Sequence, residues 1–222
     1  MDYLLLILQS ALSVFGIRAA YEQPKYDVLA RPAGGVEVRQ YGPRLAAETT
    51  VTAADEGAGR GDAFRVLADY IFGANRAPGT SGDARAGGGR KVAMTVPVQV
   101  AGATGEKVAM TVPVRVDAAG NGPALTMRFF LPSKLKADTA PIPNDPRVRV
   151  VTVPPETVAV LRFSGSWDPA ALGPKKQKLL RHLDGSPWRA TGEPYTLYYD
   201  PPFTIPLLRR NELVVPVARR AD

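Results

Sequence analysis

The chain has 222 residues, of which 45% are hydrophobic and 22% charged, and Gly and Pro contribute 21 residues each. This length and composition favour one globular domain that is large enough to build its own core. There is no Cys and only one His, His182, which excludes disulfides, thiolate catalysis and multi-histidine metal sites. The formal net charge of +7 weakly favours anionic partners.

An apolar run, YLLLILQSALSVFGI, occupies residues 3–17. It is shorter than the ~20 residues of a spanning helix, and no basic residue precedes it. Residues 1–20 are therefore expected to be an atypical signal peptide, a membrane-associating helix or a helix packed on the domain. The folded domain is expected at residues 24–218. The corresponding location is the cell envelope, periplasmic, secreted or membrane-associated, with the cytoplasm as the alternative.

The first half of the chain shows strand periodicity and then helix periodicity. Alternating residues predict strands at 26–30, 36–41 and 45–52, which suggest an antiparallel meander. Residues 62–72 carry apolar side chains at helical spacing, with Asp62 as the expected N-cap and Gly73 as the stop. Residues 77–90 are rich in Gly and predict a flexible surface loop.

A near repeat follows, in which KVAMTVPVQV at 91–100 returns as KVAMTVPVRV at 107–116. The two runs predict a hairpin whose Pro97 and Pro113 lie at a bulge or an edge. A second helix is expected between residues 167 and 185, beginning at Asp168-Pro169 or at Pro174. Further strands are expected at 125–131, 148–153, 157–164, 193–199 and 212–217. This order predicts an α+β fold, a distorted antiparallel β-barrel of two pseudo-symmetric halves with one amphipathic helix each.

Several short segments, taken together and in this order, resemble the SOUL or haem-binding protein family over residues 26–217. They are VEVRQY at 36–41, YIFGANR at 70–76, the doubled KVAMTVPV, FLP at 130–132, RFSG at 162–165, YDPP at 199–202 and RRNE at 209–212. The resemblance implies a distorted β-barrel related to the effector-binding domains of GyrI-like regulators. It also implies binding of haem or another tetrapyrrole in a shallow apolar site beside the first helix, with no agreed catalytic machinery.

A porphyrin needs an apolar platform, cations for its propionates and, optionally, an axial ligand. The platform candidates are Phe64, Leu67, Ala68, Ile71, Met94, Met110 and Phe129. The propionate candidates are Arg65, Arg76, Arg90 and Lys91. The alternative interpretation is that the apolar residues are ordinary core and the cations are solvated surface charges. Arg209 and Arg210 are expected to be structural, pairing with Glu212 or a backbone carbonyl.

The axial ligand of the predicted site has several candidates. His182 is the only imidazole, and its ordinary interpretation is a partly exposed histidine on the flank of the second helix. Tyr70, a Met or no protein ligand are the alternatives. Without a strong ligand, affinity would come from apolar burial, as suits a carrier or buffer.

No motif for nucleophilic, phosphate-binding, dinucleotide-binding or zinc-dependent catalysis occurs, and no nucleic-acid-binding motif is present. The sequence therefore favours a non-catalytic haem- or tetrapyrrole-binding protein without a nucleic-acid partner. An effector-binding barrel for another amphipathic small molecule and a haem-modifying enzyme, for example one that removes iron, are the alternatives.

Overall fold

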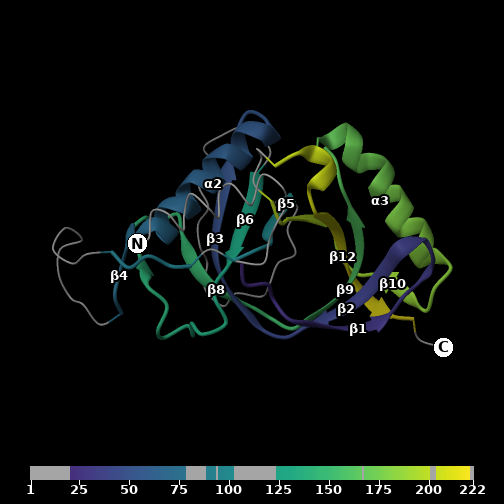
Figure 1. Cartoon of the computed structure of the whole chain (residues 1–222), viewed down its shortest axis with the longest axis horizontal. Coiled ribbons are helices and arrows are strands. Elements are labelled where there is room, and N and C mark those ends of the chain that lie inside the picture. The colour runs from purple at the N-terminus through teal and green to yellow at the C-terminus, as the bar shows by residue number, and fades with distance from the viewer. Residues whose placement is uncertain are drawn as a thin grey trace.

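The computed structural model describes residues 21–78, 89–93, 95–102, 124–166, 168–200 and 204–220. Residues 1–20, most of the predicted loop at 77–90 and the second copy of the repeat lie outside these ranges. Two helices, α2 (Glu56–Phe72) and α3 (Pro169–Asp184), cover one large curled antiparallel sheet that forms a half-barrel (Figure 1). The predicted α+β class is confirmed. No helix in the described part of the chain has the length and apolar composition needed to cross a membrane.

The main sheet runs in the order β1-β2-β9-β12-β11-β5-β6-β3-β8, with β10 paired to β12, and a separate small sheet joins β4 to β7. The strands are β1 (Tyr26–Ala30), β2 (Val36–Tyr41), β3 (Arg44–Thr52), β4 (Asn75–Arg76), β5 (Val98–Gly102), β6 (Ala124–Phe130), β7 (Ile142–Pro143), β8 (Arg149–Val153), β9 (Glu156–Phe163), β10 (Trp188–Ala190), β11 (Tyr195–Tyr198) and β12 (Asn211–Arg219). Two short 3-10 turns, η1 (Ala33–Gly35) and η2 (Pro206–Leu208), complete the described elements.

The predicted two-fold organisation is visible in this order. The unit β3-α2-β5-β6 recurs as β9-α3-β11-β12, and the two units meet at the antiparallel β5–β11 pair. Beyond these two units, the β1–β2 pair extends the second unit through β9, and β8 extends the first unit through β3. The antiparallel pairing expected for the first two strands is confirmed, because β1 pairs with β2, but the third strand of the expected meander is wrong, because β3 pairs with β6 and β8 instead of β2. Alternation shows which face a strand buries, but it does not identify the neighbouring strand.

The helix ends follow local capping rules. The α2 helix begins at Glu56 rather than at 62, because the side chain of Asp55 accepts a hydrogen bond from the Ala58 amide (2.9 Å). Three glycines in the first two turns lower helix propensity and conceal this start in the sequence. The predicted stop at Gly73 is confirmed by its φ of 122°. In α3, Asp168 caps the Ala171 amide (2.8 Å), so the start at Asp168-Pro169 is confirmed.

The buried apolar residues form three clusters. One lies between α2 and strands β3 and β6 and includes Leu67, Ile71 and Phe129. A second lies between α3 and strands β2, β9 and β12 and includes Leu179 and Leu183. The third lies on the face of the sheet opposite the helices, because neighbouring residues of β9 and β12 alternate between it and the α3 cluster. Most of the central strands are therefore buried on both faces.

A buried ionic cluster lies on the same face of the sheet as the third apolar cluster. Glu212 of β12 is fully buried, and its carboxylate accepts hydrogen bonds from Arg39 Nη1 (2.9 Å), Arg210 Nη2 (2.7 Å) and the Tyr199 hydroxyl (2.7 Å). Burial acts to raise the pKa of Glu212, but the charges of Arg39 and Arg210 and the bonds from Arg210 and Tyr199 hold it below its ordinary value. The carboxylate is therefore ionised, and it ties β2 to β12 across β9.

Removing this charge is expected to destabilise the fold. Glu212→Gln removes the buried carboxylate charge that pairs with Arg39 and Arg210, and breaking a buried pair costs about 3–5 kcal/mol. Asp62→Asn is the matched control, because it breaks the exposed Arg65–Asp62 pair (3.0 Å), which contributes at most about 1 kcal/mol. Urea denaturation measures both free energies of unfolding, and equal losses would contradict the assigned role of Glu212.

Acidification should act through the same carboxylate. The pKa of Glu212 is lower in the folded than in the unfolded chain. Its charge therefore stabilises the fold at pH values above the ordinary carboxyl range, and this stability is lost as the pH falls through the folded pKa. The unmodified protein should therefore lose more free energy of unfolding between about pH 7 and about pH 3 than Glu212→Gln does. Equal losses in urea titrations at the two pH values would show that other groups control the acid response.

Candidate functional site

An aromatic stripe lies along α2 and consists of Phe64, Ala68 and Phe72. These residues are spaced by four, so they share one face of the helix. Phe64 and Phe72 are 44% and 61% exposed, whereas Ala68 between them is 8% exposed. The Cα atoms of the two phenylalanines are separated by about 12 Å along the helix axis. The stripe therefore offers two phenyl groups at the surface with a small side chain between them.

Three other predicted platform residues are buried beneath the helix. Leu67, Ile71 and Phe129 are at most 2% exposed and belong to the cluster between α2 and the sheet. Only the Phe129 ring meets the stripe, edge-on to Phe64 with 5.4 Å between centroids. In this structure a ligand could contact Leu67 or Ile71 only after displacement of the helix. Their burial agrees with the alternative interpretation, in which these apolar residues are part of the ordinary core. Met94 and Met110 lie outside the described residues.

The C-terminal end of α2 brings three of the four predicted cations near the stripe. Asn75 donates to Tyr70 O (2.6 Å) and accepts from the Arg90 amide (3.0 Å), while the Val92 amide donates to Ile71 O (2.9 Å). Residues 90–92 therefore run beside the end of the helix, where the bond to Ile71 places them next to the residue that precedes Phe72. Arg90 and Lys91 are exposed here, and Arg76 of β4 is half-buried.

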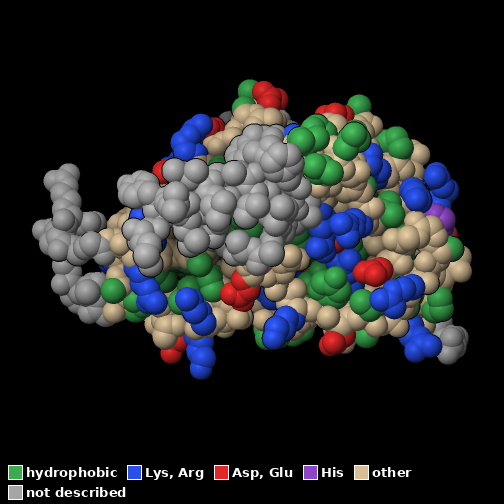
Figure 2. All heavy atoms as spheres, viewed as in Figure 1, with side chains coloured by type: hydrophobic (Ala, Val, Ile, Leu, Met, Phe, Trp, Pro, Cys, Tyr) green, Lys and Arg blue, Asp and Glu red, His purple; other side chains and the backbone are tan. Residues whose placement is uncertain are grey.

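The fourth predicted cation, Arg65, lies beside Phe64 in the sequence. It is exposed and pairs with Asp62. Figure 2 shows Lys and Arg side chains spread over the visible face, with acidic side chains among them. The distribution of charge therefore does not identify a binding site by itself. The site has to be identified from cations that lie near the aromatic stripe.

No described residue with strong axial-ligand character lies at the stripe. Tyr70 is buried, its hydroxyl donates to Pro141 O (2.9 Å), and burial raises its pKa to about 12. His182, the only imidazole, lies on α3, which packs on the other half of the sheet against β9, β10 and β12 (Figure 1). Among the residues described, no group of three or more His, Asp or Glu side chains could hold a metal ion.

The terminal arginines have the structural role expected for them. Arg210 pairs with Glu212 (2.7 Å), and Arg209 Nε donates to Thr204 O (2.8 Å). The guanidinium of Arg210 also lies 3.9 Å from the centroid of the Tyr199 ring. These contacts leave Arg210 occupied within the fold.

Comparisons with known proteins agree with this architecture. The family model described as SOUL heme-binding protein matches residues 21–216. No curated protein matches the chain.

The solved structures that resemble the chain share its fold at low sequence identity. The EcmrR C-terminal domain aligns with a TM-score of 0.55 and 11% identity, over 88% of this chain and 99% of that one. EcmrR in its DNA complex aligns at 0.52 and 11%, over 83% and 57% of the two chains. A hydrolase from Listeria innocua aligns at 0.50 and 12%, over 90% and 94%. The expected similarity to GyrI-like barrels is thus confirmed for the fold.

The burial pattern of α2 predicts which side chains are available to a ligand. Leu67→Ala should cost about 2–5 kcal/mol of stability, because it leaves a cavity under the helix. Phe72→Ala removes an exposed ring, so the change should stay within about 0.5 kcal/mol. Urea denaturation of the two variants measures the difference. A large loss in Phe72→Ala would show that this ring packs within the fold and is unavailable to a ligand.

Proposed function

The chain belongs to the SOUL heme-binding protein family, and we propose that it binds haem or a related tetrapyrrole on the aromatic stripe of α2. The observation that carries this proposal is the exposure of Phe64 and Phe72 on either side of Ala68. A porphyrin is a flat apolar disc, and the spacing of about 12 Å lets both phenyl groups contact its face or edges. The predicted platform is thereby reduced to its surface residues and extended to Phe72.

Apolar burial would supply most of the affinity. Covering about 200 Å² of apolar surface contributes about 5 kcal/mol, and part of this is lost to the entropy of association. The Phe64 ring is already packed edge-on against Phe129. Binding at the stripe would therefore be moderate in strength and reversible, which suits a carrier or buffer.

The propionates would meet the cations at the C-terminal end of α2. Arg76, Arg90 and Lys91 come from two segments that Asn75 holds together. Charge-assisted hydrogen bonds to carboxylates are about twice as strong as neutral ones. This arrangement would orient the ring with its acidic edge toward β4 and its apolar face on the stripe. Haem, when bound, would bring the redox chemistry of its iron.

A hemin titration followed by Soret absorbance tests the proposed stripe. Hemin should give a saturable one-to-one shift, and protoporphyrin IX should bind with similar affinity because no axial side chain lies at the stripe. Phe64→Ser/Phe72→Ser should weaken both by about tenfold or more, through lost apolar contact. Leu29→Ser is the matched control, because Leu29 is 46% exposed on β1 and away from α2. Unchanged affinity in the double variant would refute the stripe as the site.

The role of the cations has its own test. Protoporphyrin IX should bind about tenfold more tightly than its dimethyl ester, which lacks the carboxylates. Arg90→Gln/Lys91→Gln should reduce this preference, whereas Lys176→Gln/Lys178→Gln on the exposed face of α3 should preserve it. An unchanged preference in the first variant would show that the propionates point elsewhere.

A second candidate function follows from the fold. The EcmrR C-terminal domain has a similar structure, and the second candidate is an effector-binding barrel for another amphipathic molecule. A non-saturating response to hemin would favour this candidate. A thermal-shift screen would then identify the ligand, since a ligand far above its Kd raises stability by a few kcal/mol. Turnover of hemin to free porphyrin would instead favour the haem-modifying enzyme.

A further inference from the structure

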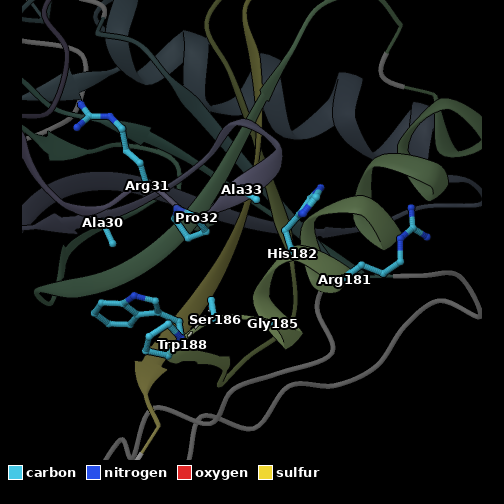
Figure 3. A pocket seen from close by; sticks show the side chains of 10 residues that line it. Ala30, Arg31, Pro32, Ala33, Arg181, His182, Gly185, Ser186 and Trp188 are labelled. Carbon is cyan, nitrogen blue, oxygen red and sulfur yellow. Dashed lines mark hydrogen bonds between the residues drawn. The ribbon is translucent and has the colours of Figure 1, made fainter.

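A hollow of about 400 Å³ lies on the other half of the molecule, between the end of α3 and the turn after β1 (Figure 3). One wall comes from residues 30–33 and the other from residues 181–188. Its residues are Ala30, Arg31, Pro32, Ala33, Arg181, His182, Gly185, Ser186, Pro187 and Trp188. It shares no residue with the aromatic stripe.

One wall depends on a glycine that packs against the histidine. Gly34 of η1 has a φ of +75°, a conformation that favours Gly, and its Cα faces the imidazole of His182. A Cβ at this position would come within 2.1 Å of His182 Nε2. Gly34 therefore permits both the turn and the position of the ring. Since α3 contacts η1 directly, the half-buried imidazole is held as part of the wall.

The opposite wall is fixed by hydrogen bonds around Ser186. Its amide and hydroxyl both donate to Leu183 O (3.0 and 2.9 Å), and its hydroxyl accepts from the Trp188 amide (3.2 Å). The Arg220 amide donates to Pro187 O (2.7 Å). These bonds order the turn that carries the indole of Trp188.

The lining combines aromatic, apolar and basic groups. Trp188 and His182 stand on different sides of the hollow, with Pro32 and Ala33 between them, and Arg31 and Arg181 leave from its two flanks (Figure 3). No carboxylate belongs to this lining. Arg31 is exposed and makes one contact of 3.5 Å with Glu37, which also pairs with Arg39, and Arg181 is exposed on α3. Both guanidinium groups are on long, exposed stems and can turn toward a ligand.

We propose that this hollow is a second ligand site, which binds a small planar aromatic carboxylate. The volume falls in the range of about 300–1,000 Å³ typical of small-molecule sites. A flat ring would pack against the indole and imidazole, whose faces favour offset or edge contacts with aromatic groups. Its carboxylate would be bound by Arg181 or Arg31, because guanidinium geometry matches a carboxylate. The inference does not depend on the function of the stripe, since the two sites lie on different halves.

The indole N–H signal of Trp188 in a ¹H–¹⁵N spectrum of the full chain reports on this site. The chain has two Trp residues, Trp167 and Trp188, so Trp167→Phe assigns the signal. Titration with 2-naphthoate should shift it saturably, and neutral 2-naphthalenemethanol should bind about tenfold or more weakly, because it lacks the charge-assisted bond. Arg31→Gln/Arg181→Gln should weaken naphthoate binding to the level of the alcohol.

Arg189→Gln is the matched control. Arg189 is exposed, does not line the hollow, and points to the opposite face of β10 from Trp188. The proposal is overturned if naphthoate does not saturate, if the alcohol binds equally well, or if Arg189→Gln weakens binding as much as the double variant. Competition between hemin and naphthoate for the Trp188 signal would also overturn it, because the two ligands would then share one site. Hemin affinity should be unchanged in Arg31→Gln/Arg181→Gln, which separates this result from the test of the stripe.

Discussion

A single buried carboxylate constrains the arrangement of the strands. Glu212 has no access to water, so its charge requires fixed cationic partners inside the protein. Arg210 precedes Glu212 by two residues in the sequence, but Arg39 comes from β2 and must reach across β9. This is possible only if β2 pairs with β9 in the second half of the sheet. The pairing of β2 with β9 therefore serves both apolar packing and charge neutralisation.

The same face of the sheet uses arginines as structural groups. Arg39 lies 4.3 Å from the Tyr26 ring centroid, Arg44 lies 4.3 Å from that of Tyr41, and Arg210 lies 3.9 Å from that of Tyr199. Each such contact contributes about 0.5–2 kcal/mol, so part of the net positive charge stabilises the fold. A ligand carboxylate must instead meet arginines and lysines with exposed heads. The proposals for Arg90, Lys91 and Arg181 rest on this division.

The sequence predicts local elements well and their long-range relations poorly. Alternation at 36–41 and the glycine at 73 define a strand and a helix end because both effects are local. β2 has β9 and not β3 as its neighbour, and this pairing involves apolar and charged contacts between residues that are distant in the sequence. Helical spacing correctly identified Leu67 and Ile71 as one apolar face, but an apolar face is equally the signature of core. Phe72 at its margin is exposed, and only the packing reveals this.

The two proposed sites lie on the two repeated units of the fold, and different segments cover the helix end in each unit. In the first half, residues 90–92 cover the end of α2 and leave its outer aromatic stripe exposed. In the second half, η1 covers the end of α3 and leaves a hollow beside it, because Gly34 lets the turn approach His182 closely. An exposed stripe can accept a ligand wider than the helix, whereas a hollow limits ligand size. The repeat thus supplies equivalent scaffolds, and the covering segments set the size of ligand that each can bind.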